Sequence, residues 1–256
     1  MMFYDLTKRF TVSLIAIAII ALLIYFSSFI YVQWFVFAFV GIMGAVGAYE
    51  YAVLSQLKRK YDLVIAVAAM VWLGYFDLQY CVLGLAFLFF FVSQFGNIST
   101  GFNEAVKGFF GLVYLGVPLT MVLSLLFVER GWVVYLLLVT KSVDICAYFG
   151  GRFIGKHKLA PELSPGKTIE GGVIGFLGAV LLSLLFGLFH FLSLKESLLM
   201  GASLGCVAQI GDLAESLLKR SFGVKDSNRL PGFGGILDML DSLLFTIPVV
   251  YLYLSL

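Results

Sequence analysis

Long apolar runs constrain the fold of this chain more than any other feature of its sequence. They recur along its 256 residues, and hydrophobic residues make up 61% of the chain whereas charged residues make up 12%. A helix of about 20 apolar residues crosses the hydrocarbon core of a bilayer, which is about 30 Å thick. A soluble protein of the same length would need a much more polar surface. The sequence therefore predicts an all-α, polytopic integral membrane protein with one membrane domain, residues 1–256.

Nine of these runs are predicted to be transmembrane helices. The predicted spans are residues 10–28, 30–49, 62–76, 78–96, 106–128, 132–150, 172–194, 197–217 and 236–255. The first span follows Lys8 and Arg9 and ends without a small-residue cleavage site, so we expect it to stay in the protein. The cysteines, Cys81, Cys146 and Cys206, lie in apolar runs without metal-ligand or disulfide spacing, and we interpret them as small core residues.

The basic residues indicate which way the predicted spans face. Most of the 17 Lys and Arg residues fall on one side, in the N-terminal segment and in and around the loops 50–61, 97–105, 151–171 and 218–235. The opposite side has only Arg130 and Lys195, and Lys141 falls inside a span. Because basic loops stay in the cytoplasm, we expect an odd number of spans and a cytoplasmic N-terminus. A net charge of +2 is too small to predict nucleic-acid binding.

Several ionisable residues lie inside the predicted spans, where a charge costs a few kcal/mol and therefore faces a cavity or a partner. Lys141 and Asp144 have i, i+3 spacing in the sixth span, and a structural ion pair is one explanation for these two. The later spans add carboxylates at helical spacing: Asp212, Glu215, Asp238 and Asp241. Carboxylates in excess of nearby cations repel one another unless a metal ion or protons neutralise them. Oxygen ligands of this kind suit Mg²⁺.

The loop sequence SPGKTIEGG, residues 164–172, resembles a phosphate site without being a Walker A motif. Pro161 stands where that motif needs glycine, and we predict no β-strand before it. What the loop does offer is Lys167 and a hydroxyl at a helix N-terminus, a geometry that suits an anion. Ordinary membrane-anchoring charge is the alternative interpretation. His157 and His190 are interpreted as incidental rather than catalytic.

The segment KRSFGVKDSNRLPGFGGILDMLDS, residues 219–242, places cations before a glycine-rich turn and carboxylates after it. The cations can hold phosphate oxygens, and the carboxylates can hold a divalent ion. Phosphoryl and nucleotidyl transfer need these two elements, since catalysis there consists mainly of positioning and charge neutralisation. A site at the cytoplasmic membrane surface can accept one water-soluble substrate and one lipid.

These residues resemble the signature of the phosphatidate cytidylyltransferase (CDP-diglyceride synthetase) family. The signature has the form S-x-[apolar]-K-R-x4-K-D, then L-P-G-H-G-G-[apolar]-x-D-R-[apolar]-D. It is matched here by Ser216, Lys219, Arg220, Lys225, Asp226, LPGFGG (230–235), Asp238 and Asp241. Phe233 and Met239 stand where the family usually has histidine and arginine. The resemblance covers residues 141–245, and the first 130 residues match only in hydropathy.

The resemblance implies a reaction in which CTP and phosphatidic acid give CDP-diacylglycerol and pyrophosphate with Mg²⁺, and it allows a second, monovalent cation such as K⁺. It implies catalytic roles for Asp212, Lys219, Asp238 and Asp241, of which the three aspartates would bind the metal. The residues expected to bind substrate are Ser164, Lys167, Ser216, Arg220, Lys225, Asp226 and Asp144. A homodimer in a bacterial inner membrane, with its site facing the cytoplasm, is also expected.

Two other functions remain open from the sequence. A cation-coupled transporter would also have carboxylates within the membrane, but it predicts internal repeats and a site at mid-depth. We find no such repeat. A different lipid-phosphate or nucleotidyl transferase is the closer alternative.

Overall fold

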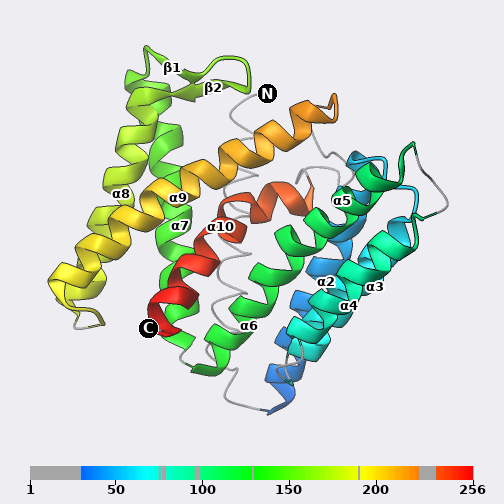
Figure 1. The fold of residues 1–256 in the computed structure, drawn as a ribbon. Coiled ribbons are helices and arrows are strands. Elements are labelled where there is room, and N and C mark those ends of the chain that lie inside the picture. The colour runs from blue at the N-terminus through cyan, green and yellow to red at the C-terminus, as the bar shows by residue number, and fades with distance from the viewer. Residues whose placement is uncertain are drawn as a thin grey trace. The chain divides into compact units, whose positions relative to one another are not determined.

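A computed structural model describes residues 30–74, 76, 79–95, 99–128, 130–189, 191–224 and 235–255 (Figure 1). The described residues form two compact units. The first contains residues up to 130 together with 235–236, and the second contains residues 131–224 together with 237–255.

The first unit is a set of packed helices. They are α2 (Ile30–Leu54), α3 (Lys60–Gly74), α4 (Gln79–Val92), α5 (Gly101–Gly111), the π-helical turn η1 (Leu112–Gly116) and α6 (Val117–Val128). From α5 through η1 into α6 the chain is helical without a break. A side chain at Gly111 would lie 2.5 Å from the ring of Tyr51, so only glycine allows this close approach of two helices. Small residues serve the same purpose in many membrane proteins.

The second unit contains four long helices and one small hairpin. They are α7 (Arg130–Ile154), β1 (Lys158–Ala160), β2 (Ser164–Thr168), α8 (Ile169–Leu188), α9 (Leu194–Ser221) and α10 (Ile236–Ser255). The first residue of α7, Arg130, and the first residue of α10, Ile236, are assigned to the first unit, and the rest of both helices belongs to the second unit. Gly201 of α9 faces Ser183 and Val180 of α8 at a distance that leaves no room for a side chain. Close packing of α8 on α9 therefore depends on small residues.

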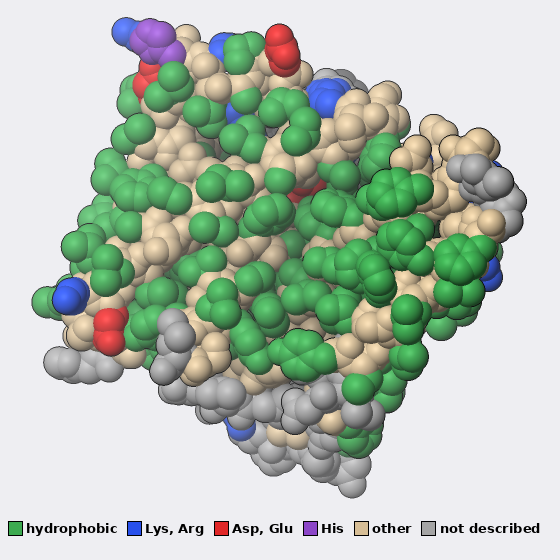
Figure 2. All heavy atoms as spheres, in the orientation of Figure 1, with side chains coloured by type: hydrophobic (Ala, Val, Ile, Leu, Met, Phe, Trp, Pro, Cys, Tyr) green, Lys and Arg blue, Asp and Glu red, His purple; other side chains and the backbone are tan. Residues whose placement is uncertain are grey.

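Among the residues that the structure describes, six helical segments are long and apolar enough to cross a membrane. They are Gln33–Leu54, Gly101–Leu126, Arg130–Ile154, Ile169–Leu188, Leu194–Ser221 and Ile236–Ser255. Hydrophobic side chains cover much of the face shown in Figure 2, and charged side chains gather near the ends of α8 and α9. This distribution supports an all-α integral membrane protein.

The prediction of nine spans is not confirmed. Helices α3 and α4 cover parts of the predicted spans 62–76 and 78–96, but they have only 15 and 14 residues. The predicted span 10–28 lies outside the described residues.

Two expectations about local structure were wrong. The segment GKT lies on β2, and β1 precedes it as its antiparallel partner. The strands are only three and five residues long, too short for an apolar alternation to reveal them. Cys81 and Cys206 are exposed rather than buried in a core. In a membrane protein, a cysteine in an apolar run can face outward, since the outer surface is also apolar.

Candidate active site

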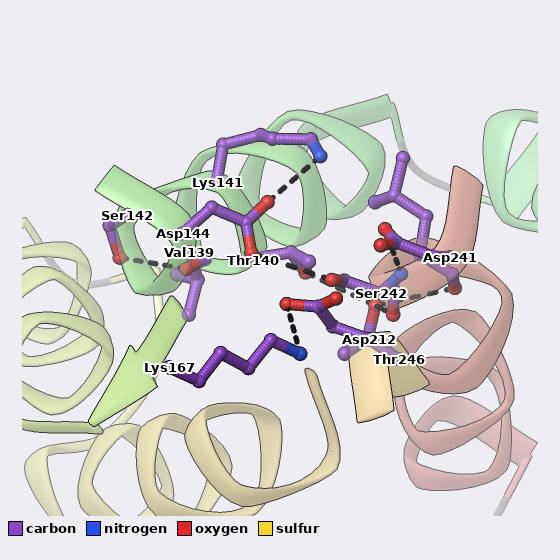
Figure 3. Close-up of polar contacts among 11 residues, drawn as sticks. Val139, Thr140, Lys141, Ser142, Asp144, Lys167, Asp212, Asp241, Ser242 and Thr246 are labelled. Atoms are coloured by element: carbon purple, nitrogen blue, oxygen red, sulfur yellow. Dashed lines mark hydrogen bonds and ion pairs between the residues drawn. The ribbon is translucent and has the colours of Figure 1, made fainter. Parts of the chain in front are cut away.

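Charged side chains from four elements of the second unit converge on one region (Figure 3). Lys141 and Asp144 come from α7, and Lys141 Nζ lies 3.0 Å from Asp144 Oδ2. Lys167 comes from β2, and its Nζ lies 2.7 Å from Asp212 Oδ2 on α9. Asp241 of α10 lies close enough to Asp212, Asp144 and Lys141 for their charges to interact. We call these five residues the inner group.

Hydroxyl groups fix the helices on which the inner group lies. Ser242 Oγ donates to Asp144 Oδ1 at 3.4 Å, and the backbone N–H of Ser242 donates to Asp241 Oδ1 at 2.5 Å. One turn earlier on α7 and one turn later on α10, Thr140 Oγ1 donates to Thr246 Oγ1 at 3.1 Å. A buried polar contact of this kind holds α7 and α10 in register, since an unpaired hydroxyl in an apolar interior is costly.

A second set of charges lies one helical turn away along α9 and α10. Lys219 Nζ is 2.7 Å from Glu215 Oε2 and 2.5 Å from Asp238 Oδ1. Lys219 lies in the last turn of α9 and Asp238 in the first turn of α10, so each charge is favoured by the dipole of its own helix. Only 12% of the Lys219 side chain is exposed. We call Glu215, Lys219 and Asp238 the terminal group.

One contact holds the hairpin against α9, a second joins α9 to the start of α8, and a third caps α8 where the hairpin ends. Arg220 Nε donates to the carbonyl of Leu163 at 3.2 Å, and Gln209 Nε2 donates to the carbonyl of Gly172 at 3.1 Å. Thr168 caps α8, since its hydroxyl accepts from the N–H of Gly171 at 3.1 Å. The predicted hydroxyl at a helix N-terminus is thereby confirmed.

The loop between α7 and β1 is held by a carboxylate. Glu170 accepts from the backbone N–H groups of Lys156 and His157, and His157 Nδ1 lies 2.6 Å from Glu170 Oε1. His157 therefore has a structural role, in which its contact with Glu170 holds the loop before β1 against the first turn of α8.

The structure brings together most of the charged residues that the sequence singled out. Asp144, Lys167, Asp212 and Asp241 meet in the inner group, and Lys219 and Asp238 meet in the terminal group. Ser164 begins β2 and Ser216 lies on α9. Arg220 contacts a backbone carbonyl of the hairpin, whereas a phosphate contact was predicted. Lys225, Asp226 and Phe233 lie outside the described residues.

The sequence did not assign site roles to Glu215, Lys141 and Ser242. Glu215 is 3% exposed and contacts Lys219 directly. Its i, i+4 spacing to Lys219 was a usable signal. Ser242 gave no such signal, because its contact with Asp144 depends on how α7 and α10 pack.

The donor set fits Mg²⁺ only in part. Among the residues that the structure describes, no three His, Cys, Asp or Glu side chains form a group that could hold a metal ion. Across the inner and terminal groups, however, five carboxyl groups face three lysines, and a bound cation would favour the ionised form of the carboxyl groups in excess. Mg²⁺ usually binds one or two carboxylates and completes its shell with water and substrate phosphate oxygens. Mg²⁺ held by these carboxylates would therefore need ligands from outside the protein to complete its shell.

Comparisons with known proteins show which family this sequence resembles. The chain matches the sequence pattern of the cytidylyltransferase family over residues 7–256. It is 31% identical to a phosphatidate cytidylyltransferase of Chlamydia pneumoniae, over 98% of this chain and 92% of that protein. It is 46% identical to a phosphatidate cytidylyltransferase of Bacillus subtilis (strain 168), over 49% of this chain and 48% of that protein.

Proposed function

The chain belongs to the cytidylyltransferase family, and on this premise we propose that it transfers the CMP moiety of CTP to phosphatidic acid in phospholipid biosynthesis. The products are CDP-diacylglycerol and pyrophosphate. The observation that carries the proposal is the inner group, in which two lysines meet three aspartates among apolar helices. The family match favours this transferase over a cation-coupled transporter.

The proposed reaction is a single displacement at phosphorus. An oxygen of the lipid's phosphate forms a bond to the α-phosphorus of CTP. The bond from that phosphorus to the α–β bridging oxygen breaks, and pyrophosphate leaves with the electron pair. The second pKa of a phosphate monoester is about 6, so the nucleophile is mostly ionised near pH 7. No histidine or other general base is required to generate it.

The residues of the two groups have separate tasks in this proposal. Lys167 and Lys219 contact the phosphates of CTP when these replace their present carboxylate partners. Asp212, Asp238 and Asp241 are the residues that would hold Mg²⁺. When bound, the ion would neutralise phosphate charge and orient the reacting groups. A monovalent cation such as K⁺ as a second ion remains a prediction.

The remaining substrate contacts are proposals from the family signature. They involve Ser164, Ser216, Arg220, Lys225 and Asp226, of which the last two lie outside the described residues. Asp144 is proposed to support the site through Lys141 and Ser242, its partners in the structure.

We also propose that the hairpin side of the second unit faces the cytoplasm of a bacterial inner membrane. The support is the distribution of Lys and Arg, since the basic loops 151–171 and 218–235 would then be cytoplasmic. Cysteine labelling with a membrane-impermeant reagent at Glu162 and at Lys195 tests this orientation. The homodimer rests on the family resemblance alone, and the mass of the detergent-solubilised protein tests it.

The activity is tested with the purified full-length chain in detergent. With CTP, Mg²⁺ and phosphatidic acid it should form CDP-diacylglycerol and one pyrophosphate per turnover. Diacylglycerol, which lacks the phosphate, is the matched control and should give no product. Absence of product from phosphatidic acid in a folded preparation, over a range of Mg²⁺ concentrations, would reject the proposed function.

A further inference from the structure

Lys141 is a charged residue of the inner group whose role neither the family signature nor the proposed reaction assigns. It lies within the apolar helix α7, which spans Arg130–Ile154. With a rise of about 1.5 Å per residue, it lies about 16 Å from the first residue of that helix and about 20 Å from the last. A lysine at such a depth is costly and is usually functional.

The surroundings of Lys141 are those of a cation that can take a further partner. Its one hydrogen bond among the described residues goes to Asp144, whereas an ammonium group has three donors. Its side chain is 30% exposed, compared with 12% for Lys219, which lies between two carboxylates. Lys141 is therefore less enclosed than the lysine of the terminal group.

Lys141 and Lys167 approach the carboxylates from opposite sides. Figure 3 shows the two ammonium groups with the carboxylates of Asp144 and Asp212 between them. Lys167 reaches in from β2, which follows the C-terminal end of α7. Lys141 belongs to α7 itself and lies one turn before Asp144, further from the hairpin.

This arrangement matches the geometry of phosphoryl displacement, in which the attacking and leaving oxygens lie roughly in line on opposite sides of the phosphorus. The leaving pyrophosphate is part of a water-soluble nucleotide, so it belongs on the side of the hairpin. The attacking phosphate belongs to a lipid whose acyl chains stay in the bilayer, so it belongs on the side of the apolar helices.

We propose that Lys141 binds the phosphate of the lipid substrate, opposite the nucleotide phosphates at Lys167. This inference rests on the proposed function. The dianionic phosphate of the lipid accepts hydrogen bonds from the Lys141 N–H groups that do not bond Asp144. The bond to Asp144 keeps the Lys141 side chain oriented toward the other carboxylates of the inner group. The alternative role is that of a counter-ion that only stabilises Asp144.

The test compares the two substrates in one variant. Lys141→Met keeps most of the length of the side chain, lacks its terminal ammonium and so removes its charge. In the proposed role it raises KM for phosphatidic acid about tenfold or more, because a charge-assisted hydrogen bond to substrate is lost. KM for CTP changes less than about twofold. Lys141→Arg keeps the charge and restores most of the affinity for phosphatidic acid. Lys195→Met is the control. It removes an exposed lysine at the second residue of α9, and it leaves both KM values unchanged.

A binding measurement keeps the test independent of turnover. Short-chain dihexanoyl phosphatidic acid should raise the Tm of the wild-type protein but not that of Lys141→Met, whereas CTP with Mg²⁺ should raise both. If Lys141→Met does not fold, Lys141→Gln, which keeps a hydrogen-bond donor for Asp144, replaces it in both measurements.

The outcomes separate the inference from the proposed function. An active wild type with an unchanged KM for phosphatidic acid in the variant overturns the role of Lys141 and leaves the reaction standing. An equal rise of both KM values, or a loss of stability alone, assigns Lys141 to the counter-ion role. A folded wild type that converts no phosphatidic acid overturns the proposed function and this inference with it.

Discussion

Charged side chains have different kinds of partner in the two units. In the first unit Arg59 pairs with Asp62, but two other charged side chains satisfy the backbone: Lys107 Nζ donates to the carbonyl of Ser55 at 2.9 Å, and Glu104 Oε2 accepts from the N–H of Lys58 at 2.9 Å. In the inner and terminal groups of the second unit they pair with one another, as in the contact of Lys167 with Asp212. The first arrangement fixes the turn between α2 and α3, whereas the second links the hairpin to α9.

The difference matters because of what each arrangement can exchange. A backbone carbonyl or N–H that loses its partner in an apolar region is left unsatisfied, so charges that hold a turn stay where they are. A lysine paired with a carboxylate can exchange it for a phosphate, and the carboxylate can exchange the lysine for a cation. Ion pairs with an excess of carboxylates therefore indicate a site for anionic substrates and metal, while charge-to-backbone contacts indicate scaffolding.

The largest effect should follow from removing a carboxylate of the second unit. Asp212→Asn and Asp238→Asn each keep the shape of the side chain but remove the charge proposed to hold Mg²⁺. We expect kcat to fall about a thousandfold, or about 4 kcal/mol of barrier, with the protein still folded in the membrane. Glu196→Gln is the matched control, because Glu196 accepts from the N–H of Ser193 in the capping box of α9. Mg²⁺-dependent turnover near the normal rate in both aspartate variants would refute their assignment.

A smaller loss is expected from Lys219, which is proposed to contact phosphate. Lys219→Met should lower kcat about a hundredfold and leave Glu215 and Asp238 without their shared cation. Lys219→Arg keeps the charge but not the compact ammonium, so it should recover only part of the rate. The measurement is turnover per folded molecule, which separates catalysis from insertion. A loss of inserted protein with unchanged turnover would place Lys219 among the scaffolding charges.

Arg220 tests the distinction between scaffolding charges and site charges. It lies in the second unit, but it donates to the backbone carbonyl of Leu163. If it anchors the hairpin, Arg220→Ala should lower kcat about tenfold by loosening the strand that carries Lys167. Hydrogen exchange over residues 158–168 should become faster. A rise in KM for CTP with unchanged exchange would show instead that Arg220 binds phosphate, as the sequence predicted.

The membrane fold class and the charged residues of the site were within reach of the sequence, for physical reasons. A charge among apolar residues is conspicuous because burying it is costly, and helical spacing then places Asp212 with Glu215 and Asp238 with Asp241 on shared faces. The family signature supplied Asp238 and Asp241 independently.

The spacing predicted the ion pair of Lys141 with Asp144 within α7, but the pairing of charges on different elements was out of reach. Lys167 meets Asp212 only because a hairpin folds back onto α9, and the hairpin's strands are too short to show a periodic pattern. Ser242 meets Asp144 only through the packing of α7 and α10. Such contacts join residues far apart in the chain, and spacing along one helix carries no information about them.

The smallest effect on turnover is expected in the first unit, from Glu104, which is 8% exposed. Glu104→Ala removes the acceptor of the Lys58 N–H, so the free energy of unfolding should fall by about 1–3 kcal/mol. Glu104→Gln keeps an acceptor oxygen and should recover much of this loss. Because Glu104 satisfies the backbone and does not pair with a lysine of the site, kcat per folded molecule should change less than about twofold in both variants. Thermal unfolding in detergent and turnover measured on the same preparations test the two statements together. A large loss of kcat at unchanged stability would mean that a charge bound to the backbone can also serve the reaction, and the distinction between the two units would no longer identify the site.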